Sequence, residues 1–188
     1  DNLQFVGGIQ RIYAGAISPN GQYFVVSSGS GGDRPPINDT AVAFPLTSTS
    51  DNVQPLWISR LFDSVYSIAI SETAVYLGGH FNYMESPTAR DPWPGLDDVA
   101  YGRGQGLAGY GLGYAIVTRE HIGAISPTTG KALEWNPGSN SFEGNKAMLV
   151  HPRGLITGGD ATTQGGYNVG RVAFYDFGSV AAPGQNET

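Results

Sequence analysis

The side chains best suited to chemistry gather in one stretch of the chain, residues 84–118. This stretch combines aromatic rings, paired carboxylates and a guanidinium with many Gly and Pro residues, a composition typical of a functional loop. Aromatic faces stack on the apolar faces of sugar rings, while charged groups hydrogen-bond the hydroxyls. The stretch therefore predicts a ligand-binding loop, and a self-packed cover over a sheet edge is the alternative. The candidate ligand-binding residues in it are Trp93, Asp97, Asp98, Tyr101 and Arg103.

The carboxylates of this stretch leave two other kinds of site open. Calcium could be bound by Asp91, Asp97 and Asp98, although the alternating Asp spacing of a calcium loop is absent. Acid–base hydrolysis by a carboxylate pair is a further alternative, because Glu85 and Glu120 flank the same stretch. The sequence has no Gly-x-Ser-x-Gly elbow, and the absence of Cys excludes a thiol nucleophile. We expect recognition rather than catalysis, and no cofactor apart from the calcium alternative.

Two further polar residues occupy matching positions after glycine pairs. His80 follows the pair at 78–79, and Asp160 follows the pair at 158–159. Matching positions point side chains toward the same face, so both residues are candidates to line a binding face. The alternative for Asp160 is that it caps a turn, which is a common role of Asp beside Gly.

The elements that position these residues follow a pattern that recurs along the chain. In each copy an alternating strand turns into a second strand that ends at glycine, and a third strand follows. The Gly-Gly pairs at 78–79 and 158–159 lie 80 residues apart. Trp57 and Trp135, each on an expected fourth strand, lie 78 residues apart. The agreement of the two offsets sets the register of the predicted repeat.

This pattern predicts an all-β fold of four-stranded antiparallel β-propeller blades, about three in the chain. A single such sheet cannot bury both of its faces, and radial stacking of sheets solves that problem. Closed propellers have about 4–8 blades, so we expect the chain to be a fragment of a larger propeller, whose remaining blades are its partners. The expected parts are the tail of a preceding blade (1–11), a blade (12–60), a blade (64–140) with an insertion (84–118), an incomplete blade (143–178) and a polar tail or linker (179–188).

Composition and charge narrow the class of partner. The formal net charge of -6, without a Lys/Arg cluster, argues against nucleic acid. No apolar run approaches the roughly 20 residues that cross a bilayer, so we expect no membrane insertion. Glycosylation-type triplets begin at Asn38 and Asn186, both in polar stretches expected to be exposed.

The sequence resembles the delta-60-repeat, β-propeller-like proteins that are common among secreted bacterial, especially actinobacterial, proteins. The resemblance rests on 74–81, 122–138 and 155–177, where strands end at Gly-Gly and a Pro-Thr-Thr-Gly-Lys turn precedes Trp-Asn-Pro-Gly. It implies a propeller-like fold and a secreted or cell-surface location, and it carries over no catalytic residues. The long stretch at 84–118 departs from the family pattern.

A second likeness concerns one turn. The docking motif of quinone-dependent dehydrogenase propellers is similar at Ala124, Thr129, Gly130 and Trp135, but Ser126 replaces the Asp of that motif. We interpret this likeness as shared turn geometry between blades.

Together these observations predict an extracellular, non-enzymatic recognition or scaffold module. We expect it to bind a polysaccharide, a glycoprotein or a neighbouring subunit through the propeller face and the insertion 84–118. Two alternatives remain at this stage. One is a carbohydrate-active hydrolase or lyase that uses carboxylates of the insertion, and the other is a purely structural component of a surface assembly.

Overall fold

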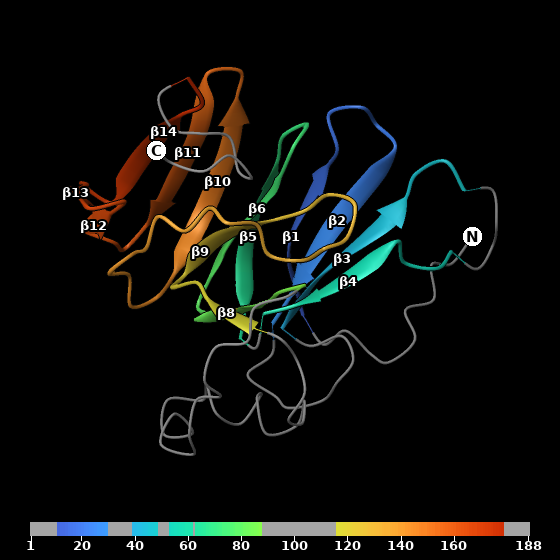
Figure 1. Cartoon of the computed structure of the whole chain (residues 1–188), viewed down its shortest axis with the longest axis horizontal. Helices are drawn as coiled ribbons and strands as arrows, with labels where there is room; N and C mark the ends of the chain where they lie inside the picture. The colour runs from blue at the N-terminus through green and yellow to red at the C-terminus, as the bar shows by residue number, and fades with distance from the viewer. Residues whose placement is uncertain (1–10, 30–38, 49–52, 62, 88–115, 179–188) are drawn as a thin grey trace, which may run out of the picture.

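The computed structural model describes residues 11–29, 39–48, 53–61, 63–87 and 116–178. All regular structure in these residues is β-strand, arranged in antiparallel sheets, which confirms the all-β class. Accordingly, no helix in the described part of the chain is long and apolar enough to cross a membrane. Figure 1 shows the three larger sheets side by side in chain order, with the first on the right and the third on the left.

Three sheets and two short hairpins make up the fold, and neighbouring strands in each run antiparallel. Sheet 1 has the order β1 (Ile12–Ile17), β2 (Tyr23–Ser28), β3 (Thr40–Pro45) and β4 (Trp57–Arg60). Sheet 2 has the order β5 (Val65–Ile70), β6 (Val75–Gly79) and β9 (Ile122–Ile125). Sheet 3 has the order β10 (Asn145–His151), β11 (Gly154–Gly159) and β14 (Val172–Asp176). The hairpins are β7 (Tyr83–Glu85) with β8 (Ile116–Thr118), and β12 (Thr163–Gln164) with β13 (Tyr167–Asn168).

The expected fourth strand forms in sheet 1 but not in sheet 2. There it is reduced to a single bridge between Ile125 and Ala132, formed by hydrogen bonds from Leu133 N to Ala124 O, 2.9 Å, and from Ser126 N to Lys131 O, 2.8 Å. Ala132 donates its N–H to Glu85 O at 2.9 Å, which joins this segment to β7. Sheet 2 thus has three strands among the described residues, where four were predicted.

The first hairpin of each sheet carries the same irregularity. The register shifts between Ile12 and Ala14 in sheet 1, between Val65 and Ser67 in sheet 2, and between Asn145 and Ala147 in sheet 3. A bulge of this kind bends a strand and re-aims the side chain of its extra residue. The extra residues are Tyr13, Tyr66 and Lys146.

The first strands bring the three sheets together, because β5 packs against both β1 and β10. At each junction a serine hydroxyl donates to the carbonyl just before the bulge. Ser27 Oγ donates to Val65 O at 2.9 Å, and Ser67 Oγ donates to Asn145 O at 3.0 Å, and both bonds are buried. A bulge interrupts the ladder, and these hydroxyls supply partners for buried carbonyls beside it.

Apolar side chains fill the spaces between the sheets. One core cluster lies between sheets 1 and 2, and a second lies between sheets 2 and 3. The first is built around Val25, Ala43, Trp57, Ile68, Leu77 and Ile125, and the second around Ala69, Tyr76, Ala124, Trp135 and Leu155.

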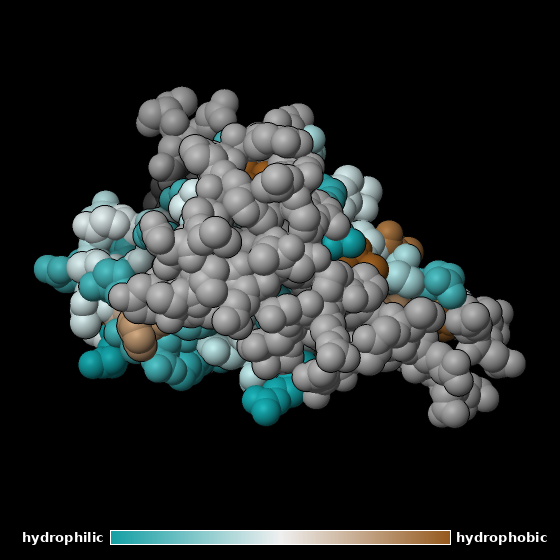
Figure 2. Space-filling model, turned by 90° about the horizontal axis from the view of Figure 1, so that it is seen from below, coloured by the Kyte–Doolittle hydropathy of each residue, from teal (hydrophilic) through white to brown (hydrophobic). Residues whose placement is uncertain are grey.

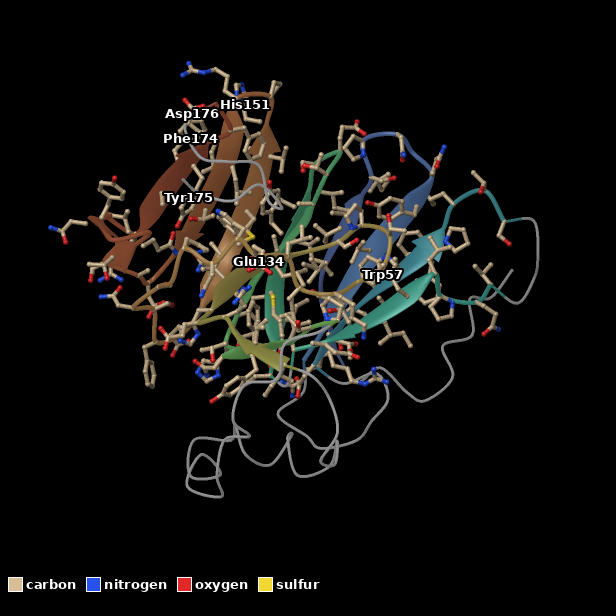
Figure 3. The ribbon with its side chains drawn as sticks, viewed as in Figure 1. Trp57, Glu134, His151, Phe174, Tyr175 and Asp176 are labelled. Atoms are coloured by element: carbon tan, nitrogen blue, oxygen red, sulfur yellow. The ribbon has the colours of Figure 1, made fainter. Side chains whose placement is uncertain are left out.

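Trp57 of sheet 1 is docked onto a turn of sheet 2. Its indole Nε1 donates to Pro127 O at 2.8 Å. Gly130 has φ +67°, and a Cβ added there would lie 2.7 Å from Trp57 Cε3. The labelled Trp57 in Figure 3 lies where sheet 1 meets the strand and turn that follow β9. Gly130 is thus required both by its backbone angle and by the close approach of the indole ring.

We predict that Gly130→Ala destabilises the fold more than Gly138→Ala. Both glycines have φ +67°, which costs an L-residue about 1–2 kcal/mol. A Cβ at Gly138 meets nothing within 4 Å, whereas a Cβ at Gly130 collides with Trp57 and adds about 1–3 kcal/mol of overpacking. Denaturant titration of both variants gives the comparison, and equal losses in the free energy of unfolding would contradict the docking role of Trp57.

Candidate functional site

Most of the residues predicted from the sequence to bind a ligand lie outside the described residues. These are Trp93, Asp97, Asp98, Tyr101 and Arg103, with the calcium candidate Asp91 and the glycosylation candidates Asn38 and Asn186. The structure does describe the two ends of the insertion, where Glu85 of β7 pairs with Ile116 of β8. Figure 1 places β8 at the lower end of the sheets, the end at which the bulges lie.

At this end the bulge residues Tyr13, Tyr66 and Lys146 form a row across the three first strands, which we name the bulge row. The ring centroids of Tyr13 and Tyr66 lie 5.1 Å apart, edge to face. Lys146 Nζ lies 5.9 Å from the centroid of the Tyr66 ring and 3.0 Å from Glu143 Oε2. The bulges thus align two aromatic rings and a cation that are far apart in the sequence.

The charge state of the row is well defined. Burial, and then the nearby charge of Asp63, raise the pKa of the Tyr66 hydroxyl above its usual value, so this hydroxyl stays protonated at neutral pH. The hydrogen bond to Glu143 is the largest of the effects that raise the pKa of Lys146, which therefore stays cationic. The row offers aromatic surface, a neutral hydroxyl group and an exposed ammonium group to a ligand.

His80, predicted from the sequence, connects this row to an exposed aromatic ring. Its Nδ1 lies 3.4 Å from Asp63 Oδ2, and its ring centroid lies 6.3 Å from that of Phe142 and 6.0 Å from that of His121. Phe142 is 71% exposed. Asp63 therefore acts on both His80 and Tyr66, so the two groups belong to one surface.

Asp160, also predicted from the sequence, has the geometry of the turn-capping alternative. Its carboxylate accepts hydrogen bonds from the Ser141 hydroxyl and from the N–H groups of Phe142 and Glu143, both at 3.0 Å. It thereby holds the turn that presents Phe142 and Glu143 beside His80 and Lys146. Asp160 supports the candidate surface through this turn.

Sequence reasoning missed the bulge row. A signal was present, because Tyr66 and Lys146 each lie 12 residues before the first glycine of a Gly-Gly pair. That spacing does not reveal a bulge, which depends on how two strands pair. In Figure 2 the molecule is seen from this end, and the described residues on the side of sheet 3 are mainly hydrophilic.

Glu85, one of the carboxylates considered for acid–base work, is buried between two cationic side chains. Its carboxylate oxygens pair with Arg60 Nη1 of sheet 1 at 3.3 Å and with Lys131 Nζ, which follows the turn that contacts Trp57. Its backbone carbonyl accepts the N–H of Ala132. These contacts give Glu85 a structural role between sheet 1 and the turn. Among the described residues no three His, Asp or Glu side chains are grouped closely enough to hold a metal.

A cavity of about 550 Å³ lies at the opposite end, between the first hairpin turns of sheets 2 and 3. Its walls include Ile70, Tyr76, Val150 and Phe177. The hydroxyl of Ser71, which also lines it, already accepts N–H groups of its own turn. The bulge row offers more charged and aromatic groups in mutual contact, so we consider it the stronger candidate.

We predict that Asp160→Asn lowers the free energy of unfolding by about 2 kcal/mol near neutral pH, because the N–H donors lose a charged acceptor. Burial disfavours the ionised carboxylate of Asp160, but the hydrogen bonds from Ser141, Glu143 and Phe142 outweigh it and lower the pKa from 3.8 to about 2. A depressed pKa in the folded state means that the stabilisation is present above about pH 4 and is lost toward pH 2. The difference between the wild type and the variant should therefore shrink across that window in denaturant titrations.

The matched control is Asp176→Asn. Asp176 pairs with the exposed Arg153 at 3.6 Å, which is worth little, and accepts one backbone N–H, from Gly178 at 2.8 Å, where Asp160 accepts two backbone N–H groups and a hydroxyl. A loss for Asp160→Asn no larger than that of this control would contradict the capping role.

Comparison with known proteins identifies no relative of this chain. No family model, curated protein or solved structure matches the chain at a level that would show a family. The resemblance to delta-60-repeat proteins therefore stays a prediction, and a function must be argued from the residues of the chain itself.

Proposed function

We propose that this chain is a non-enzymatic, extracellular recognition module of the β-propeller type. Its ligand is a polysaccharide or the glycan of a glycoprotein, bound at the lower end of the sheets by the bulge row, His80 and Phe142. Trp93 and Tyr101 of the insertion 84–118 are a second set of proposed ligand-binding residues, and they lie outside the described residues. Calcium at Asp91, Asp97 and Asp98 remains part of the proposal, as a structural ion of that insertion.

The observation that carries this proposal is the contiguity of the aromatic and charged groups. Tyr13, Tyr66 and Phe142 offer ring faces and edges on which sugar rings stack, and Lys146 and Glu143 offer groups that bind hydroxyls. All of them come from strand ends and turns at one end of the sheets. Because three sheets contribute, the surface is extended rather than a closed pocket, which suits a chain-like ligand.

A propeller-type arrangement is supported by how the sheets meet. The first strands of the three sheets lie next to one another, and each sheet buries a face on the next. Radial stacking of antiparallel sheets is the architecture that repeats such contacts. Binding at one end of the stacked sheets follows naturally, since loops and strand ends converge there.

The two carboxylates whose surroundings the structure describes in detail, Glu85 and Asp160, favour recognition over hydrolysis. Glu85 is occupied between two cations, and Asp160 is occupied by the turn that it caps. A purely structural role within an assembly is a second candidate, and the exposed apolar side chains of sheet 3 favour it.

The test is a glycan-array screen followed by calorimetric titration of any glycan bound. We expect Phe142→Ala and Lys146→Ala each to weaken binding about tenfold, which corresponds to about 1.4 kcal/mol. Both side chains are exposed, so neither change should disturb folding. Tyr167→Ala is the control, because Tyr167 is an equally exposed aromatic residue on β13, outside the bulge row.

A variant without residues 88–115 separates the insertion from the bulge row. Binding that survives the deletion but fails with Phe142→Ala places the ligand on the row, and the reverse places it on the insertion. If the folded wild type binds no glycan, the carbohydrate proposal is wrong.

A further inference from the structure

The cavity between the first hairpin turns of sheets 2 and 3 lies at the end of the sheets opposite the bulge row, and the proposed glycan surface does not use it. We name it the turn cavity. Its volume of about 550 Å³ lies within the range of about 300–1,000 Å³ that is typical of small-molecule pockets. Figure 3 labels His151, one of its lining residues, in the upper part of the view, at the turn between β10 and β11. The cavity is large enough for a ligand of its own.

The walls of the turn cavity are mainly apolar. Ile70 and Val150 come from the ends of the first strands of sheets 2 and 3, and Phe177 follows β14. The rings of Tyr76 and Phe177 lie nearly parallel, with 6.0 Å between their centroids. Phe177 is held at the cavity by its own N–H, which donates to Arg153 O at 2.9 Å. An apolar or aromatic body placed here buries its surface against these side chains.

The turns that form the rim of the cavity are held by hydrogen bonds of their own. Ser71 N donates to Ala74 O at 2.9 Å, and the Ser71 hydroxyl accepts the N–H groups of Thr73 and Ala74. In the facing turn of sheet 3, Arg153 N donates to His151 Nδ1 at 3.2 Å. A rim fixed in this way needs little ordering when a ligand binds, which lowers the entropic cost of binding.

The lining of the turn cavity carries one negative charge and no positive charge. Glu72 is its acidic residue, and within the described part of the chain no Lys or Arg pairs with the Glu72 carboxylate. His151 is uncharged in this arrangement, because the nitrogen that accepts a hydrogen bond bears a lone pair in place of a proton. The neighbouring Arg153 pairs with Asp176 at 3.6 Å. The charge of Glu72 is thus available to a cationic group.

We propose that the turn cavity binds a small organic amine, whose apolar or aromatic body packs against Val150 and Phe177 and whose ammonium group pairs with Glu72. The apolar walls hold the body, and charge complementarity selects an ammonium over an uncharged or anionic head group. The rings of Tyr76 and Phe177 add to this preference, because an aromatic face attracts a cation. The cavity is a second binding site, separate from the proposed glycan surface.

The test compares three probes that share a phenyl body and differ in the head group: 2-phenylethylamine, 2-phenylethanol and 3-phenylpropanoate. Each is titrated into the whole chain near neutral pH, and its dissociation constant is taken from backbone amide shifts in heteronuclear NMR spectra. We expect the amine to bind about fivefold more tightly than the alcohol, as an exposed ion pair allows. The propanoate should bind more weakly than the alcohol. The largest shifts should fall in residues 70–76 and 150–153.

Two variants test the parts of the site separately. Glu72→Gln removes the charge and keeps the shape of an exposed turn side chain, so the amine and the alcohol should then bind equally, with the affinity for the alcohol unchanged. Phe177→Ala removes a wall and should weaken both probes about fivefold. Glu143→Gln is the matched control, because it removes an exposed carboxylate at the opposite end of the sheets and should keep the preference for the amine.

Four results overturn the proposal. The first two are the absence of any shift with the amine, and equal binding of the amine and the alcohol by the wild type. The third is a preference for the amine that survives Glu72→Gln. The fourth is a set of shifts centred on Val172 and Phe174, which would place the probe on exposed apolar side chains of sheet 3. Glycan binding at the bulge row is measured separately and depends on none of these outcomes.

Discussion

The structure depends on one constraint: the sheets are apolar on both faces, and a face left in water forgoes the stabilisation that burial provides. Sheet 2 shows this most clearly, since Leu77 and Ile125 face sheet 1 while Tyr76 and Ala124 face sheet 3, and all four are buried. Burial of apolar area is the dominant favourable contribution to folding, so stacking is the way that such sheets become stable. The docked Trp57 and the buried Ser27 and Ser67 hydroxyls then determine how the sheets are aligned.

Stacking also creates the candidate binding surface. Each first hairpin has its bulge at the same place, so aligning the first strands aligns the bulge residues Tyr13, Tyr66 and Lys146. A bulge inside one isolated hairpin would only bend it. Three aligned bulges place two rings and an ammonium group in mutual contact, and the turn capped by Asp160 adds Phe142 beside them. The surface is a consequence of the packing that stabilises the fold.

The charged groups fall into two sets with different surroundings. Glu85 is buried and held by Arg60 and Lys131, where a carboxylate needs such partners because burial of an unpaired charge is costly. Glu143 and Lys146 are exposed beside aromatic rings, where they remain able to contact a ligand, whereas the mostly buried Asp63 carboxylate holds His80 and the N–H of Ser64. This division supports a binding role for the lower end of the sheets and a structural role for the carboxylate of β7.

The sequence by itself determined the all-β class and most strands, because alternation, turn residues and glycine stops act over a few neighbouring residues. It also identified His80 and Asp160 as matching positions. It did not determine the bulge row, the partners of Glu85 or the loss of the fourth strand in sheet 2. Each of these depends on residues distant in the chain, such as Ser27 with Val65, or Trp57 with Gly130. Local patterns specify strands, but only the packing of one sheet on another decides which side chains meet.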